Sequence, residues 1–319
     1  MRRVAALRIG TRASALALWQ AEHVAAQIRR EPGAPPVELV HISTEGDLRT
    51  DVPLWTVGGK AFFTKEIDRA LLAREIDVAV HSLKDLATIL EPGLELAAVL
   101  AREDPSDALL SREGTLLPEL PTGARVGTSS LRRRAFLRHA RGDLNLAELR
   151  GNVPTRVEKL LNGDYDAIIL ATAGLKRLGL EGHITCQLSV TDFPPAVSQG
   201  AIGVCVRADD ADARRWLHPL DDRAARLATT AERALLAGIE AGCQVPLGAL
   251  ATLEGENLHL HVSVCALDGS SMLTAAGRSA ALPGNAAQLG ERLARELVAK
   301  GARALIAEVR NVDTAVAAP

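Results

Sequence analysis

A repeated order of short apolar strand, loop and helix runs through the first two thirds of the sequence. Leu7–Thr11 has the composition of a strand, and apolar residues then recur at helical spacing up to Ile28, behind a serine, Ser14, that can cap a helix. Two later segments, Ile76–Val80 and Tyr165–Ile169, resemble each other, which indicates an internal repeat. Because alternating strands and helices are typical of α/β folds, the sequence predicts two α/β lobes built on one plan.

The pattern changes after Pro219. A helical stretch over 223–240 is followed by a loop and by alternating residues such as 258–262, and an amphipathic helix begins near Asn285. Strands that neighbour each other in sequence, with helices at either end, indicate a small α+β domain. Before Pro219 we expect strands at 7–11, 37–43, 76–83, 124–126, 144–149 and 165–171, and helices from Ser14, near Thr64, over 131–140, from about Pro154 and around Lys176.

Composition and charge argue against several classes of protein. The chain has 319 residues, of which 47% are hydrophobic and 24% charged, as is ordinary for a globular protein of two or three domains. No apolar run reaches the roughly 18 residues of a membrane span, and no signal peptide is recognised, so we expect a cytoplasmic protein. A net charge of −2 gives no reason to expect nucleic acid or a membrane as partner. The four cysteines lack metal-binding spacing and Gly58–Lys60 lacks the P-loop pattern, so neither a metal nor a nucleotide is expected.

Three loops that follow predicted strands and precede predicted helices combine hydroxyl groups with arginines. They are 11–14, 127–130 with Arg132 and Arg133, and 150–152, which leads to Thr155 and Arg156. A helix N-terminus offers unpaired N–H groups, and guanidinium groups complete an anion site. Because ligands of α/β proteins bind at the carboxyl ends of strands, the loops together predict a site for several carboxylates or phosphates. The alternative for any single loop is a capped helix with solvated arginines.

A lysine and an aspartate, Lys84 and Asp85, come directly after the predicted strand that ends in His81 and Ser82. A carboxylate there can stabilise a developing cation or transfer a proton, although a surface ion pair explains the same spacing. We interpret His81 as a hydrogen-bonded structural histidine rather than a base. Cys243 lies in a predicted turn, where a thiol can be exposed and reactive, whereas most unpaired cysteines are small buried hydrophobic residues.

Seven segments of the sequence together resemble the porphobilinogen deaminase family. They occur in the family order between Leu7 and Val309 and are LRIGTRASALALWQ, VGGKAFFTKE, DVAVHSLKD, GTSSLRRR, LRGNVPTR, YDAIILATAGLKRLGL and AERALLAGIEAGCQVPLGA. One segment alone is weak, but seven in one order are highly specific. The resemblance implies two α/β lobes that are periplasmic-binding-protein-like, over 1–100 with 200–218 and over 105–195, and a small C-terminal α+β domain over 222–313 that carries a cofactor.

The resemblance also implies the chemistry. A dipyrromethane cofactor would be attached through a thioether at Cys243, and four porphobilinogen molecules would be joined to it with release of ammonia. Asp85 would be the catalytic carboxylate that stabilises the cationic intermediate, and Lys60 and Phe63 would lie on a mobile loop that covers the site. Water would release the linear tetrapyrrole. The protein would be a monomer whose product passes to a uroporphyrinogen-forming enzyme.

The side chains that would bind the carboxylates of cofactor and substrate follow from the matching motifs. For the cofactor they are Ser82, Lys84, Thr128, Ser129, Arg132, Arg133 and Arg150, and for the substrate they are Arg12, Ser14, Arg156, Arg177 and Gln199. Each added pyrrole brings two carboxylates, so the site must hold a growing polyanion. This requirement explains why so many cations occur in these loops of a chain whose net charge is −2.

Four positions depart from the family pattern. Thr56 stands where lysine is common, Ala87 where proline usually follows the Lys-Asp-Leu run, and Ser198 and Ala241 where glycine is usual. Thr56 affects the expected contacts between the covering loop and the cofactor, and Ala87 allows a different path for the chain after Asp85. None of the four removes a residue that the chemistry requires.

Two other classes of function fit parts of the sequence. A two-lobed anion-binding protein without catalysis would use the same loops, but the extra domain with Cys243 and the lack of a recognised signal peptide argue against it. An acyl-transfer enzyme would use Cys243 as nucleophile, but no histidine is evident as its partner. The mass of the isolated protein separates the hypotheses, because only the deaminase carries a covalently bound dipyrromethane.

Overall fold

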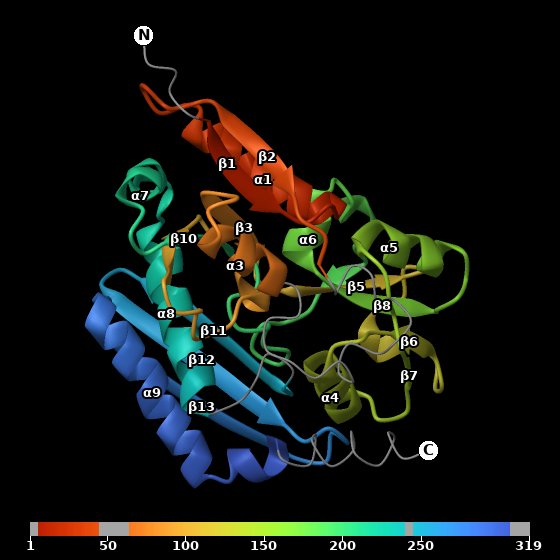
Figure 1. Ribbon diagram of the computed structural model, residues 1–319. Coiled ribbons are helices and arrows are strands. Elements are labelled where there is room, and N and C mark those ends of the chain that lie inside the picture. Colours follow the sequence, from red (N-terminus) through yellow and green to blue (C-terminus); the bar gives the residue numbers. More distant parts are fainter. Residues whose placement is uncertain (1–5, 45–63, 240–244, 307–319) are drawn as a thin grey trace, which may run out of the picture. The chain divides into compact units, whose positions relative to one another are not determined.

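The computed structural model describes residues 6–44, 64–239 and 245–306 (Figure 1). These residues form two compact units. The first unit contains 6–44, 64–103 and 200–226, and the second unit contains 104–199, 227–239 and 245–306. The second unit thus includes both the segment expected to form the second lobe and the C-terminal segment.

A five-stranded sheet forms the centre of the first unit. The strand order is β2-β1-β3-β10-β4; β1 runs parallel to β2 and β3, whereas β10 runs antiparallel to β3 and β4. The strands are β1 (Leu7–Thr11), β2 (Val37–His41), β3 (Val78–Ser82), β4 (Leu94–Val99) and β10 (Ile202–Arg207).

Helices cover both faces of this first sheet. They are α1 (Ala15–Ile28) and α7 (Ala211–Leu217) on one face and α3 (Lys65–Leu72) on the other. Strand β3 contributes Val78 and Val80 to one core and Ala79 to the other. A strand that is buried on both faces needs a continuous apolar sequence, which explains why residues 78–80 show no alternation.

A second five-stranded sheet lies in the second unit and has the same plan. Its order is β7-β6-β8-β5-β9, with β6 parallel to β7 and β8, and β5 antiparallel to β8 and β9. The strands are β5 (Asp107–Ser111), β6 (Arg125–Gly127), β7 (Asn145–Ala147), β8 (Ala167–Ala171) and β9 (Cys186–Gln187). The helices are α4 (Leu131–Ala140) on one face and α5 (Val153–Leu161) and α6 (Thr172–Arg177) on the other.

The predicted internal repeat is confirmed, and it extends to single hydrogen bonds. Asp77, before β3, accepts from the backbone N–H of Arg8 at 3.0 Å, and Asp166, before β8, accepts from the backbone N–H of Arg125 at 2.7 Å. In both places the aspartate N–H donates back to the carbonyl of the same arginine at 2.9 Å. The two matching aspartates therefore fix the register of equivalent parallel strands.

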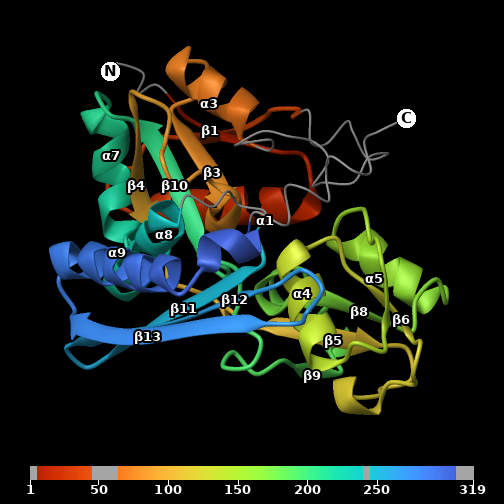
Figure 2. The same cartoon turned by 90° about the horizontal axis from the view of Figure 1, so that it is seen from below.

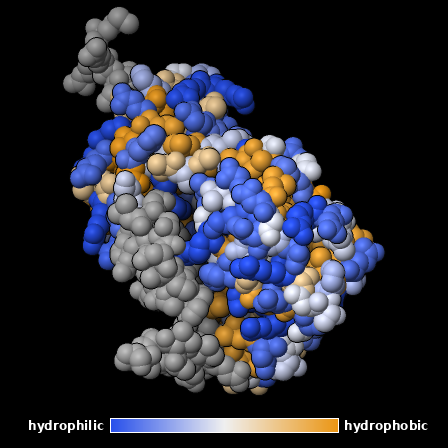
Figure 3. All heavy atoms as spheres, turned by 90° about the vertical axis from the view of Figure 1, so that its right-hand side faces the viewer, coloured by the Kyte–Doolittle hydropathy of each residue, from blue (hydrophilic) through white to orange (hydrophobic). Residues whose placement is uncertain are grey.

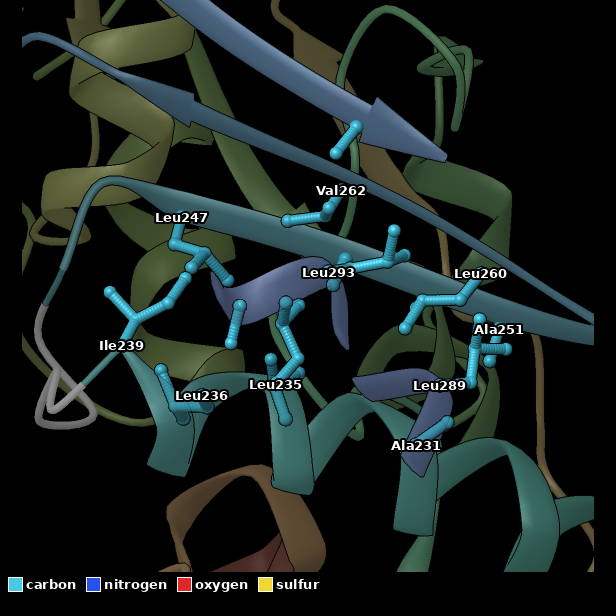
Figure 4. Packing of buried hydrophobic residues seen from close by; sticks show 14 of the residues in the cluster. Ala231, Leu235, Leu236, Ile239, Leu247, Ala251, Leu260, Val262, Leu289 and Leu293 are labelled. Carbon is cyan, nitrogen blue, oxygen red and sulfur yellow. The ribbon is translucent and has the colours of Figure 1, made fainter. Parts of the chain in front are cut away.

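The third sheet is an antiparallel meander in the second unit. It consists of β11 (Leu247–Glu254), β12 (Asn257–Cys265) and β13 (Met272–Ala280), and helices α8 (Arg223–Gly238) and α9 (Pro283–Ala299) pack on it. Figure 2 shows both helices along one side of this sheet. Leu235 and Leu293 of the helices meet Leu260 and Val262 of β12 in the core drawn in Figure 4. The small α+β domain expected after Pro219 is confirmed.

The remaining helical elements are short. Among the residues that the structure describes, four 3-10 turns occur: η1 (Leu83–Asp85), η2 (Leu117–Glu119), η3 (Glu181–His183) and η4 (His218–Leu220). On the face in Figure 3 hydrophobic residues form separate groups among hydrophilic ones. Within the described ranges, no helix has the length and apolar character needed to span a membrane.

Candidate active site

The loops that follow β1 and β3 meet at one edge of the first sheet. The two strands are parallel neighbours, with Ile9 opposite Val78, so their carboxyl ends lie side by side. A pocket at this edge is lined by four predicted site residues and by three further polar side chains: Arg12, Ser14, Ser82 and Asp85, with Gln20, Thr64 and His81. The structure therefore brings together side chains that are up to 73 positions apart in the sequence.

Asp85 is presented by the 3-10 turn η1, which follows β3 directly. Leu83 and Leu86, on either side of the polar pair, are buried in one core of the first unit, and the N–H of Leu83 donates to the carbonyl of Ala201 at 3.0 Å. This anchoring leaves Lys84 half-buried and Asp85 exposed. An exposed carboxylate on an anchored turn can contact a substrate without rearrangement of the backbone.

Gln20 is a pocket residue that the sequence analysis missed. It lies on α1 and is 2% exposed, and its Nε2 donates to Ser82 Oγ at 2.9 Å. Ser14 is the N-cap of the same helix and accepts from the N–H of Ala17 at 3.4 Å. The signal that could have found Gln20 is a polar residue on the apolar face of a helix, because such a residue needs a buried partner.

His81 lies on β3 in the wall of the same pocket and is buried. Burial lowers the pKa of its imidazole to about 4, and the charge of Arg12 acts in the same direction, so the ring is neutral near pH 7. Its Nε2 is buried without a hydrogen-bond partner, which differs from the expected hydrogen-bonded structural histidine.

The predicted loops of the second unit lead into capped helices, as the alternative hypothesis required. Ser130 caps α4 by accepting from the N–H of Arg133 at 3.5 Å, and Asn152 caps α5 by accepting from the N–H of Thr155 at 3.0 Å. Thr128 and Ser129 are buried, and Ser129 Oγ donates to the carbonyl of Leu149 at 2.5 Å. These hydroxyl groups hold the loops themselves, and their expected role in binding the cofactor stays a prediction.

Arg132 and Arg133 are not solvated side chains, because both are buried against Asp107. Arg132 Nη2 lies 2.6 Å from one carboxylate oxygen of Asp107, and Arg133 Nη2 lies 2.7 Å from the other. Gln199, expected at the substrate, is 1% exposed and donates to the same carboxylate at 2.8 Å. We name these four residues the Asp107 cluster. Asp107 is not among the predicted site residues, although an aspartate at the start of the apolar strand β5 is a signal for a buried, paired carboxylate.

Opposing effects set the pKa of Asp107. Burial raises it, but the charges of Arg132 and Arg133 and the hydrogen bonds from Arg133 and Gln199 outweigh burial, so the pKa lies far below its usual range. Burial and the neighbouring Arg133 lower the pKa of Arg132, which Asp107 partly offsets. With both arginines protonated, the cluster carries one more positive than negative charge. Such a surplus favours an anion as a further partner.

The other predicted arginines of the second unit have different surroundings. Arg150 and Arg177 are half-buried. Arg156 lies in the first turn of α5, where its Nε donates to the carbonyl of Gly151 at 2.7 Å. Their roles as carboxylate ligands stay predictions. Lys60, Phe63 and Cys243 lie outside the described residues, as do Thr56 and Ala241.

The described cysteines fit the expectation of small hydrophobic residues. Cys205 and Cys265 are buried and Cys186 is half-buried. Burial raises the pKa of the Cys265 thiol to about 11, with a further contribution from Asp268, so the thiol is protonated and unreactive near neutral pH. Over the parts of the chain that the structure describes, no group of histidine, cysteine and acidic side chains has the arrangement of a metal site.

Comparison with known proteins gives matches over nearly the whole chain. A family model described as porphobilinogen deaminase, dipyromethane cofactor binding domain, matches residues 7–215, and a model of the porphobilinogen deaminase C-terminal domain matches residues 226–299. Porphobilinogen deaminase of Roseiflexus sp. is 52% identical over 301 residues, which cover 94% of this chain and 98% of the relative. That of Syntrophobacter fumaroxidans is 46% identical over 303 residues, which cover 95% and 97%.

Solved structures match at lower identity. The methionine binding protein MetQ has a TM-score of 0.43 and 14% identity and covers 67% of this chain and 89% of its own. A nutrient binding protein from Burkholderia cenocepacia bound to methionine has a TM-score of 0.42 and 16% identity, with coverages of 66% and 89%. The family models and the two relatives in sequence, by contrast, match both the segment with the pocket and the C-terminal segment. On these matches, the chain belongs to the porphobilinogen deaminase family, which has a dipyrromethane cofactor binding domain.

Proposed function

We propose that the chain is a hydroxymethylbilane synthase, which joins four porphobilinogen molecules head to tail and releases one ammonia at each addition. The observation that carries this proposal is the pocket of the first unit, which Arg12, Ser14 and Asp85 line together. A guanidinium and a hydroxyl group there can bind a carboxylate arm of the substrate, and Asp85 can face its pyrrole ring.

In this mechanism Asp85 acts at the step that creates positive charge. The amino group on the aminomethyl arm of porphobilinogen is protonated, the C–N bond breaks and ammonia leaves with the bonding electrons. The methylene carbon stays on the pyrrole, which becomes a cation delocalised over the ring nitrogen. The Asp85 carboxylate accepts a hydrogen bond from the ring N–H and stabilises this cation. The free α-carbon of the growing chain then attacks the methylene carbon, a C–C bond forms, and the proton of the attacking carbon is lost.

The residues of the second unit fit a cofactor that carries several carboxylates. The Asp107 cluster has a surplus positive charge, and Arg132 Nε is a buried donor with no hydrogen-bond partner. When bound, the dipyrromethane supplies the free pyrrole α-carbon on which the chain grows. In this proposal Cys243 holds it through a thioether, and Ser82, Lys84, Thr128, Ser129, Arg132, Arg133 and Arg150 bind its side chains.

We further propose an oligomeric state, a cellular location and a downstream enzyme. The family membership supports a monomeric cytoplasmic enzyme that passes its linear tetrapyrrole to a uroporphyrinogen-forming enzyme. Sedimentation of the purified protein tests the monomer, since a monomer would have the 33.7 kDa of the chain plus its adduct. Sedimentation as a dimer would contradict that part of the proposal alone.

The decisive experiment is to measure the mass of the untreated protein. We expect the wild type to weigh more than its 319 residues by one dipyrromethane and to give colour with a pyrrole-reactive aldehyde dye. Cys243→Ser should show neither the added mass nor the colour. A wild-type protein that has only its sequence mass, and gains none with porphobilinogen, would exclude the synthase and leave the anion-binding protein as the better hypothesis.

Asp85 is tested by a substitution that preserves its shape. Asp85→Asn should retain the fold and the adduct but lose turnover by roughly a thousandfold or more, because the amide cannot neutralise the cation. Asp212→Asn, which removes an exposed carboxylate on α7, is the matched control and should keep full turnover. Turnover in Asp85→Asn within a few fold of the control would remove Asp85 from the mechanism.

A further inference from the structure

Asp107 lies where two cationic side chains of α4 converge. Its side chain is fully buried at the start of β5, and its oxygens accept from Arg132 Nη2 at 2.6 Å and from Arg133 Nε and Nη2 at 3.1 and 2.7 Å. Backbone carbonyls also hold the two arginines. Arg132 donates to the carbonyl of Pro194 at 2.7 Å, and Arg133 donates to the carbonyl of Ile169 at 2.9 Å. Both guanidinium planes are therefore fixed by acceptors that the protein supplies.

The third donor to Asp107 brings no charge. Gln199 Nε2 lies 2.8 Å from Asp107 Oδ1 and also donates to the carbonyl of Pro105 at 2.8 Å. An amide completes the hydrogen bonding of the carboxylate without changing the charge of the cluster. A lysine or arginine at this position would have raised the surplus from one charge to two.

The surplus charge is costly because the two guanidinium groups are buried. The side chains of Arg132 and Arg133 are 4% and 7% exposed, so solvent screens them poorly. Arg132 forms two hydrogen bonds with its five N–H groups, and its Nε is buried without a partner. A single carboxylate bound to this cluster would make it neutral, whereas two would leave a surplus negative charge.

We propose that Asp107 is a positioning residue that sets the charge of the site: it orients Arg132 and Arg133 and cancels one of their two charges, so the pair accepts one carboxylate of the dipyrromethane. This inference rests on the proposed function. It predicts an unusual coupling between the residues, because Asp107 is needed only while both arginines are present. Removal of Asp107 should harm the wild type but help a variant that has already lost one arginine.

The test compares three variants in apoprotein made without a supply of porphobilinogen. Asp107→Asn leaves two buried guanidinium groups without a counter-ion and should lower the melting temperature by roughly 10 °C. Arg132→Gln leaves Arg133 and Asp107 as an ion pair with no net charge. This variant should gain the mass of the cofactor roughly tenfold more slowly than the wild type when porphobilinogen is added. The double variant Asp107→Asn/Arg132→Gln restores one surplus charge, so it should melt above Asp107→Asn and load faster than Arg132→Gln.

A matched control is available in the first unit. Arg207 is buried and forms an ion pair with Asp77 at 3.3 Å, so Arg207→Gln should lower the melting temperature but leave the loading rate unchanged. A double variant that melts below Asp107→Asn, or loads more slowly than Arg132→Gln, would overturn the inference, since a merely structural Asp107 predicts additive damage. The melting comparison decides the charge argument without loading, whereas a wild type that gains no mass overturns the proposed function as well.

Discussion

Ser198 combines two unfavourable features in one residue. Its backbone φ is 63°, in the left-handed region, and its hydroxyl is buried without a hydrogen-bond partner. The conformation is held because the N–H of Ser198 donates to the buried carboxylate of Glu232 at 2.6 Å. A glycine at this position would have no Cβ to oppose this conformation. The departure noted in the sequence is therefore a site of local strain.

We expect Ser198→Gly to raise the free energy of unfolding by about 1 kcal/mol, because relief of the left-handed strain exceeds the entropy that glycine adds to the unfolded chain. Urea unfolding measures the change. Ser198→Ala is the control, since it removes the hydroxyl but keeps the Cβ. An alanine variant more stable than the glycine variant would show that the hydroxyl, and not the backbone, carries the cost.

His81 makes the stability of the first unit depend on pH. Its folded pKa is about 4, against about 6.5 in an unfolded chain, so the unfolded state binds the proton more tightly. The stabilisation is therefore present above pH ~6.5 and is lost as pH falls through about 4. Relative to His81→Gln, the wild type should lose on the order of 3 kcal/mol of unfolding free energy between pH 7 and 4, measured by urea titrations. Parallel pH profiles of the two proteins would contradict the buried, neutral ring.

The close contact between helices α8 and α9 limits which side chains fit at the contact. A Cβ at Gly290 of α9 would lie 2.1 Å from the carbonyl oxygen of Ala231 in α8, whereas a Cβ at Gly284 of the same helix meets nothing within 4 Å. Both positions should gain from alanine through helix propensity, by up to about 1 kcal/mol. Only Gly290 opposes this gain with a backbone collision.

We therefore expect opposite signs for the two substitutions. Gly290→Ala should lower the free energy of unfolding by about 2 kcal/mol, since α8 and α9 must separate along their contact. Gly284→Ala should leave it unchanged or raise it by up to about 1 kcal/mol. Thermal melts of both variants check this, and equal melting temperatures would mean that the close approach of the helices is not needed.

The predicted and observed bounds agree for elements that depend on neighbouring residues and differ for those that depend on distant partners. Helix α4 has the predicted bounds, 131–140, because its cap and its turn are adjacent in sequence. The strand expected over 37–43 ends at His41, where its partner β1 ends at Thr11. No strand was assigned to Ile202–Arg207, which is β10. All six of its residues are buried and its partners on β3 and β4 are 104 to 126 positions away in the sequence, so no local period marks it.

Across the second unit, the third sheet is docked on α4. Arg138 Nη1 donates to the carbonyl of Leu267 at 2.7 Å, and the thiol of Cys265 donates to the carbonyl of Ala135 at 3.6 Å. A Cβ on Gly269, in the turn between β12 and β13, would lie 2.5 Å from the backbone nitrogen of His139. The helix that carries two arginines of the Asp107 cluster is thereby fixed to the C-terminal sheet.

Gly269→Ala should break this docking and expose Cys265. We expect alkylation of Cys265, followed by mass spectrometry of its peptide, to accelerate by roughly tenfold or more, because opening replaces a buried thiol with an accessible one. Gly255→Ala is the control: Gly255 also has a positive φ, of 60°, but a Cβ there meets nothing within 4 Å. Equal alkylation rates in the two variants would show that the docking does not depend on the close contact.

The sequence by itself determined the fold class, the internal repeat and the family, because helical periodicity, caps and motifs are properties of neighbouring residues. It also placed Arg12, Ser14 and Asp85 in loops after strands, where the structure has them. Only the tertiary structure decided which charges share one buried volume. Asp107 is 25 and 26 positions from its two arginines and 92 positions from Gln199, and only the tertiary fold brings the four side chains together. The charge of a site depends on these distant partners, since a guanidinium that is solvated and one that is paired look the same in the sequence.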